Sequence, residues 1–285
     1  MKLEIKKQLP YISPSAYMAW ENCEYFHYLR KLAGLKFPRQ PQSDAAAVGT
    51  VFDICVKSYM AKQLGEVIDR EKLWKNLEIT SSQSGVIKAG IELWKLYYKS
   101  EAFHRMKTMV TSVDLKCETE HNGIPIFGYP DAQTRIDPFD WKTSGYNATY
   151  TRSPNPGYSI CYNLSEGGVW KTMHKRCGEP LDKLNYAWAV QCLFYSWMLD
   201  VPTPGGVIHQ LIFQPNRILC AVLDARISDE CIEKTEKGIA RMWEQSLSGD
   251  FDYPTPGDRI CKSYGQWCEA ACHCDYHMEW LKDGF

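Results

Sequence analysis

Two aspartates and one lysine near the middle of the chain have residue types and a spacing that can do chemistry. Pro130-Asp131 is followed nine residues later by Asp140-Trp-Lys142. Residues i and i+2 of a strand share a face, so Asp140 and Lys142 point the same way, and a neighbouring strand can bring Asp131 alongside. Carboxylates bind Mg²⁺ together with water and substrate phosphate, and a nearby ammonium stabilises hydroxide or developing negative charge. This trio is suited to hydrolysing a phosphodiester.

The short Asp/Glu-x-Lys pattern is weak evidence when taken alone. It occurs three times, at 4–6, 114–116 and 140–142. Only the copy at 140–142 has a Pro-Asp upstream at the distance of a hairpin. For Asp140 and Lys142 by themselves, an exposed charge pair on a strand is the alternative interpretation.

Elements of both kinds are predicted around this trio. Helical periodicity, caps and stop signals predict helices, and β-branched runs with turn signals predict strands. The predicted helices are 14–33, 45–64, 83–103, 184–199 and 228–247, and the predicted strands are 109–120, 124–136, a third after Pro138, 206–214 and 218–226. The first three strands read as a β-meander. Residues 143–180 are rich in Gly, Pro, Asn, Ser and Tyr and read as an insertion or an active-site flap.

The pattern predicts one α/β domain over 1–285. A mainly helical part over 1–108 precedes a core over 109–250, and a Cys-rich tail follows over 251–285. No internal repeat and no linker divides the chain, so a single domain is the simplest account.

Composition excludes several classes of protein. Lys and Arg number 33 against 34 Asp and Glu, a net charge of -1, which excludes a wholesale basic nucleic-acid binder but allows a local basic face such as 171–176. The N-terminus lacks the apolar run of a signal peptide. The longest apolar stretch, 184–199, is polar-interrupted and too short to cross a bilayer. We expect a cytoplasmic protein in a reducing compartment, without membrane association.

Taken together, these motifs resemble the PD-(D/E)xK nuclease superfamily, and within it the RecB-like exonucleases and the CRISPR-adaptation nucleases. The resemblance covers nearly the whole chain in five ordered blocks. The blocks are Ser13-Pro-Ser15 with Cys23-Glu-Tyr25-Phe26, Gly49-x-x-x-Asp53, Pro130-Asp131 with Asp140-Trp-Lys142-Thr143, Gln191-x-x-x-Tyr195, and the C-terminal cysteines.

The resemblance implies a restriction-endonuclease-like core, a mixed central β-sheet flanked by helices. It implies a Mg²⁺- or Mn²⁺-dependent deoxyribonuclease, an exonuclease acting on single- or double-stranded DNA ends in recombination, repair or phage-type DNA processing, with protein partners in a DNA-processing complex. Its catalytic residues would be Asp131, Asp140, Lys142, Gln191 and Tyr195. Gln191 and Tyr195 are four apart and share one helix face.

One block departs from the family pattern. The family has His where this chain has Asp53, and that His helps to bind the metal. Carboxylate oxygen suits Mg²⁺ or Mn²⁺ at least as well, so Asp53 is expected to join Asp131 and Asp140 as a metal ligand. The alternative is that Asp53 faces solvent and the chain is a catalytically weakened, nuclease-fold DNA-binding or adaptor protein.

The tail cysteines form a separate candidate site. Cys261, Cys268, Cys272 and Cys274 lie within fourteen residues, a density that indicates metal ligation in a reducing compartment. Their spacing fits neither a paired zinc ribbon nor a ferredoxin. The resemblance implies a structural 4Fe-4S cluster held by Cys23, Cys261, Cys268 and Cys274. The alternative is structural Zn²⁺ held by the four tail cysteines alone.

Overall fold

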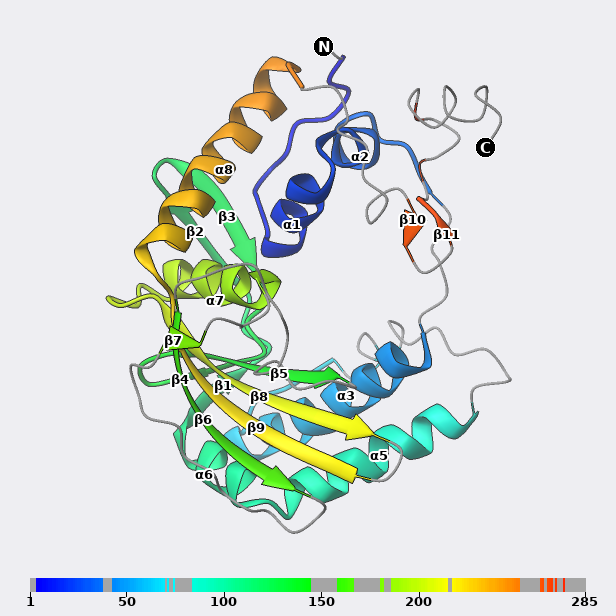
Figure 1. Cartoon of the computed structure of the whole chain (residues 1–285), viewed down its shortest axis with the longest axis vertical. Helices are drawn as coiled ribbons and strands as arrows, with labels where there is room; N and C mark the ends of the chain where they lie inside the picture. The colour runs from blue at the N-terminus through cyan, green and yellow to red at the C-terminus, as the bar shows by residue number, and fades with distance from the viewer. Residues whose placement is uncertain are drawn as a thin grey trace. The chain divides into compact units, whose positions relative to one another are not determined.

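The computed structural model shows two compact units (Figure 1). One consists of Met1–Gln40, Glu120–Phe127 and Lys234–Phe285, and the other of Pro41–Thr119 and Gly128–Glu233. The limits of a single domain over 1–285 stay a prediction. The structure describes residues 4–37, 43–69, 71, 74, 84–144, 158–166, 180–181, 186–214, 217–251, 262–263, 266–268, 270 and 274.

The second unit is built on a seven-stranded mixed sheet of order β1-β4-β5-β8-β9-β6-β7. Only β5 and β8 run parallel, and every other neighbouring pair is antiparallel. The strands are β1 (Val110–Val113), β4 (Ala132–Thr134), β5 (Pro138–Ser144), β6 (Tyr158–Glu166), β7 (Pro180–Leu181), β8 (Gly205–Gln214) and β9 (Arg217–Arg226). The expected central mixed sheet is therefore confirmed.

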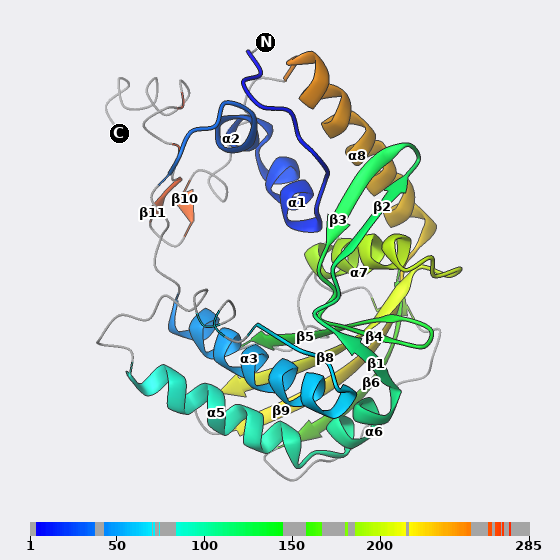
Figure 2. The same ribbon diagram turned by 180° about the vertical axis from the view of Figure 1, so that it is seen from behind.

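Helices cover both faces of this sheet (Figure 2). On one face lie α3 (Asp44–Leu64), α5 (Ser84–Tyr98) and α6 (Glu101–Met109), and on the other lies α7 (Tyr186–Met198). The helix expected over 83–103 is two helices, because Ser100 caps α6. Its hydroxyl accepts from the Phe103 N–H at 3.0 Å and donates to the Tyr97 carbonyl at 2.6 Å.

Two further sequence predictions need correction. The expected meander is wrong, since β1 pairs with β4, while β2 (Cys117–His121) and β3 (Ile124–Gly128) form a separate hairpin that Ile12 joins through a parallel bridge to Ile126. The Asn122-Gly123 turn, both residues at positive φ, closes that hairpin. The segment 143–180 is more than a flap, because it contains β6, which pairs with β9. The composition of this segment did not predict strand β6, whose partner β9 lies far along the chain.

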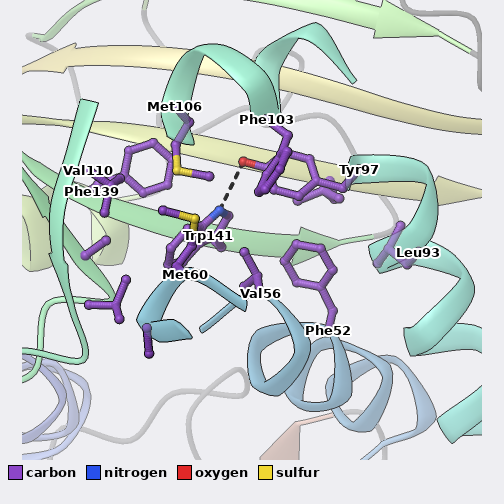
Figure 3. Packing of buried hydrophobic residues seen from close by; sticks show 14 of the residues in the cluster. Phe52, Val56, Met60, Leu93, Tyr97, Phe103, Met106, Val110, Phe139 and Trp141 are labelled. Atoms are coloured by element: carbon purple, nitrogen blue, oxygen red, sulfur yellow. Dashed lines mark hydrogen bonds between the residues drawn. The ribbon is translucent and has the colours of Figure 1, made fainter. Parts of the chain in front are cut away.

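Side chains of β5 alternate between two environments. Phe139 and Trp141 are buried in the cluster formed with α3, α5 and α6 (Figure 3), so Asp140 and Lys142 point to the opposite face. In the cluster, Trp141 Nε1 donates to the Tyr97 hydroxyl at 3.1 Å. That hydroxyl also bonds His209 Nδ1 of β8 at 2.5 Å. Burial lowers the pKa of His209 to about 3, so the ring is neutral.

Replacing Tyr97 by Phe tests the buried hydrogen bonds that link Trp141, Tyr97 and His209. The change leaves the Trp141 indole N–H and the His209 ring nitrogen without their shared partner, and we expect a loss of about 1–3 kcal/mol in the free energy of unfolding. Tyr98→Phe is the matched control, since Tyr98 is 39% exposed, and it should leave the free energy of unfolding nearly unchanged. Urea denaturation measures both. Equal stability of the two variants would contradict a structural role for the hydrogen bonds of the Tyr97 hydroxyl.

The first unit starts with a broken helix. The helix expected over 14–33 is α1 (Pro14–Asn22), α2 (Glu24–His27) and a π-helical turn, η1 (Tyr28–Leu32). The break lies at Cys23, which is extended at φ -161 and ψ 104. In the same unit, Trp20 Nε1 donates to Gln245 Oε1 at 2.7 Å, which ties α1 to α8 (Asp229–Ser248). The tail contributes a short hairpin of β10 (Lys262–Ser263) and β11 (Gln266–Trp267).

Candidate active site

Asp140 and Lys142 meet α7 on the sheet face opposite the large core cluster. The Lys142 ammonium forms an ion pair with Asp140 Oδ2. It also donates to Gln191 Oε1 at 2.8 Å. Gln191 Nε2 in turn donates to the Tyr195 hydroxyl at 2.8 Å, and that hydroxyl donates to the Tyr129 carbonyl at 3.0 Å. The chain of bonds fixes the position of the lysine ammonium.

Asp131 reaches the same place from the neighbouring strand. It directly precedes β4, which pairs with β5 in a register that sets Ala132 opposite Phe139. The Trp141 backbone N–H donates to Asp131 Oδ2 at 3.2 Å. The structure thus brings together all five predicted catalytic residues: Asp131, Asp140, Lys142, Gln191 and Tyr195. Their catalytic roles stay predictions.

A second lysine, absent from the sequence analysis, lies beside these residues. Lys57 of α3 is only 7% exposed, and its ammonium is 2.6 Å from Asp131 Oδ1, 3.0 Å from Asp53 Oδ2 and 3.5 Å from Asp114 Oδ1. Asp53, the predicted metal ligand, is therefore paired with Lys57 in this structure, and its role as a ligand stays a prediction. The i, i+4 spacing of Asp53 and Lys57 was the available signal, but it is also common on solvated helices.

The charges of this site are unequally compensated. Burial raises the pKa of Asp140 well above its usual range, against the opposing effect of Lys142. Burial acts the same way on Asp131, but Lys57, with help from Asp140 and Lys142, outweighs it and holds the pKa of Asp131 below its usual range. Burial and Asp131 raise the pKa of Asp53 despite Lys57. Of these three carboxyl groups, only Asp131 has a pKa below its usual range.

The oxygen atoms fit a hard cation. Asp140 is buried, its Oδ2 forms the ion pair with Lys142, and its Oδ1 has no hydrogen-bond partner among the described residues. Asp53, Asp114, Asp131 and Asp140 against Lys57 and Lys142 leave a formal charge of -2. Oxygen donors of this kind suit Mg²⁺ or Mn²⁺. Within the described part of the chain no three Asp, Glu, His or Cys side chains are arranged as a ready metal site.

Gly49, the first residue of the Gly-x-x-x-Asp block, lets α3 approach β5. A Cβ at this position would overlap the Thr143 hydroxyl, next to Lys142. We expect Gly49→Ala to cost about 1–3 kcal/mol of stability through overpacking. Gly85→Ala is the control, because a Cβ at Gly85 of α5 meets no atom within 4 Å, and it should stabilise by about 0.5–1 kcal/mol. Thermal unfolding checks both, and destabilisation by Gly85→Ala alone would refute the packing argument.

The predicted cluster ligands are described in part. Cys261 lies outside the described residues, as do Cys272 and the basic segment 171–176. Cys23 Sγ accepts from the Phe26 N–H at 3.3 Å. Half-buried Cys268 packs against an apolar cluster that contains Tyr28 and Leu29, and Tyr25 and Phe26 pack against the same cluster. Cys268 is therefore near the segment that follows Cys23.

The fold is shared with a solved structure. The chain is similar to the crystal structure of a "Putative exonuclease" from Eubacterium rectale. The TM-score is 0.59 at 15% sequence identity, over 96% of this chain and 94% of the other. No protein-family model and no curated protein matches the sequence. The likeness shows that the two chains share a mixed α/β fold. No helix among the described residues is long and apolar enough to cross a membrane.

Proposed function

We propose that the protein is a Mg²⁺- or Mn²⁺-dependent deoxyribonuclease, an exonuclease that hydrolyses DNA ends in recombination, repair or phage-type DNA processing. The observation that carries the proposal is the buried Asp140 carboxylate, which is ion-paired with the fixed Lys142 ammonium and lies beside Asp131. The RecB-like motif order and the fold shared with a protein named as an exonuclease support it.

Each side chain has a role in this proposal. Asp131 and Asp140 would hold the cation, which lowers the pKa of a bound water and offsets charge on the phosphate. Lys142 orients the attacking water and stabilises the negative charge that develops on the phosphate oxygens. Gln191 holds the Lys142 ammonium in place, and Tyr195 holds Gln191 through its hydroxyl. In-line displacement then breaks the phosphodiester bond.

The test is a nuclease assay with purified protein. Linear and circular DNA, single- and double-stranded, are incubated with Mg²⁺ or Mn²⁺, and with EDTA as control. We expect degradation of linear DNA that requires the metal and is lost in Lys142→Ala. Full activity of Lys142→Ala, or no degradation of any DNA, would overturn the proposal.

A second candidate is a nuclease-fold DNA-binding or adaptor protein with weakened chemistry. The pairing of Asp53 with Lys57, at the position where the family has a metal-binding His, favours it. Tight DNA binding without cleavage, unchanged in Asp140→Ala, would establish this alternative.

For the tail we propose a structural 4Fe-4S cluster held by Cys23, Cys261, Cys268 and Cys274. Two observations support the fit: Cys23 is at the N-terminus of α2, where backbone N–H groups stabilise a thiolate, and Cys268 packs near the residues that follow it. Iron and labile sulfide should be found in anaerobically purified protein and lost in Cys23→Ser but not in Cys55→Ser. Zinc retained in Cys23→Ser would instead favour the four tail cysteines.

We place this activity in the cytoplasm, where thiols stay reduced, and expect protein partners that deliver DNA ends. Copurification from anaerobic lysate, with and without DNase treatment, tests for such partners. Recovery of no DNA-processing protein in either condition would contradict them.

A further inference from the structure

The Lys57 ammonium occupies a position among carboxylates like that of a bound metal ion. Its ammonium lies within 3.5 Å of oxygens from three aspartates, and the side chain is 7% exposed. The three partners come from separate parts of the second unit: Asp53 from α3, Asp114 from the end of β1 and Asp131 from the start of β4. Such convergence around one point is the arrangement that a divalent ion makes with hard oxygen ligands.

In both Asp131 and Asp140, the two carboxylate oxygens have different surroundings. Asp131 Oδ1 contacts Lys57 while Oδ2 accepts from the Trp141 N–H. Asp140 Oδ2 is ion-paired with Lys142, while the buried Oδ1 has no hydrogen-bond partner among the described residues, which leaves Oδ1 as the oxygen available to a divalent ion. The remaining formal charge of -2 equals that of one divalent ion, and a second would leave the buried site with excess positive charge.

We propose that Lys57 is a built-in cation of the nuclease site, so that the site binds one divalent ion, at Asp131 and Asp140, instead of two. Asp53 and Asp114 then serve to hold Lys57. The inference rests on the proposed nuclease function and concerns which positions the metal occupies. Lys57 is a positioning residue for Asp131, since its ammonium fixes the carboxylate edge that faces away from the metal.

Counting bound metal tests this proposal without an activity readout. Mn²⁺ is titrated into full-length, metal-free protein, free Mn²⁺ is followed by its EPR signal, and heat is measured by calorimetry. Wild type should bind one Mn²⁺. Lys57→Met should bind two, because removal of the ammonium vacates a position lined by three carboxylates. Lys57→Arg keeps the charge and should bind one. Lys62→Met, an exposed lysine of the same helix, should match wild type.

The outcomes separate this proposal from the proposed function. Two Mn²⁺ in wild type, or one in Lys57→Met, overturns the role of Lys57 and leaves the nuclease proposal standing. No Mn²⁺ in either protein, with Asp140→Asn unchanged from wild type, overturns both. If Lys57→Met is unfolded without metal, recovery of folding in Mn²⁺ by circular dichroism supports replacement of the ammonium by the ion. Failure to fold with and without Mn²⁺ overturns it.

Discussion

Asp140→Asn should lower DNA hydrolysis by about a thousandfold or more and leave the apo protein at least as stable as wild type. The activity falls because the carboxylate that faces the cation is lost, which removes several kcal/mol of charge stabilisation from the transition state. Stability does not fall because burial already favours the neutral form of Asp140. Amide and neutral carboxyl have the same shape, and Lys142 keeps its bond to Gln191.

Single-turnover hydrolysis and thermal unfolding measured on the same preparation check this pair of effects. Glu118→Gln makes the same chemical change on an exposed residue of β2 and should alter neither quantity. A melting temperature for Asp140→Asn several degrees below that of wild type would show that Asp140 is a structural partner of Lys142. Retained hydrolysis would remove Asp140 from the site.

Asp131→Ala should also abolish hydrolysis, but with a large loss of stability, about 3–5 kcal/mol. Its carboxylate is the closest partner of the buried Lys57 ammonium, at 2.6 Å, and it accepts from the Trp141 N–H. Alanine would leave a buried ammonium with only the more distant Asp53 and Asp114 and a backbone donor without its acceptor.

Chemical denaturation measures the effect. Glu92→Ala removes the partner of Lys95 in an exposed ion pair of α5 and should leave the free energy of unfolding nearly unchanged. Asp131 and Asp140 are thus expected to affect the free energy of unfolding in opposite directions. The Asp140 carboxylate lowers the stability of the metal-free protein, and the Asp131 carboxylate raises it. Equal stability of Asp131→Ala and Asp140→Asn would refute that distinction.

Local sequence patterns predicted most of the second unit. The apolar spacing of α3, the alternation along β5 and the four-residue spacing of Gln191 and Tyr195 depend on neighbours within one turn or one pleat. The patterns therefore fixed which side chains share a face. The hairpin distance from Asp131 to Asp140 also correctly placed the two residues on adjacent strands.

Features set by distant partners were not predictable in this way. The helix over 14–33 is interrupted at Cys23, although the cap and stop signals at its two ends read correctly. Strand β6 depends on β9, more than fifty residues later, and its own composition suggests a loop. The sequence around Lys57 is that of an ordinary helix lysine, and its contacts with Asp114 and Asp131 depend on the folded sheet. No window of sequence contains that information.

The parallel pairing of β5 with β8 determines when the site assembles during synthesis. Asp140 is opposite Ile208, and Lys142 is opposite Gln210, a partner that leaves the ribosome 68 residues later. Gln191, which fixes Lys142, also lies in this interval. A nascent chain that ends before β8 has Asp140 and Lys142 on an unpaired strand edge. The proposed cutting activity therefore requires synthesis of the chain at least through β8, so a shorter nascent chain should lack it.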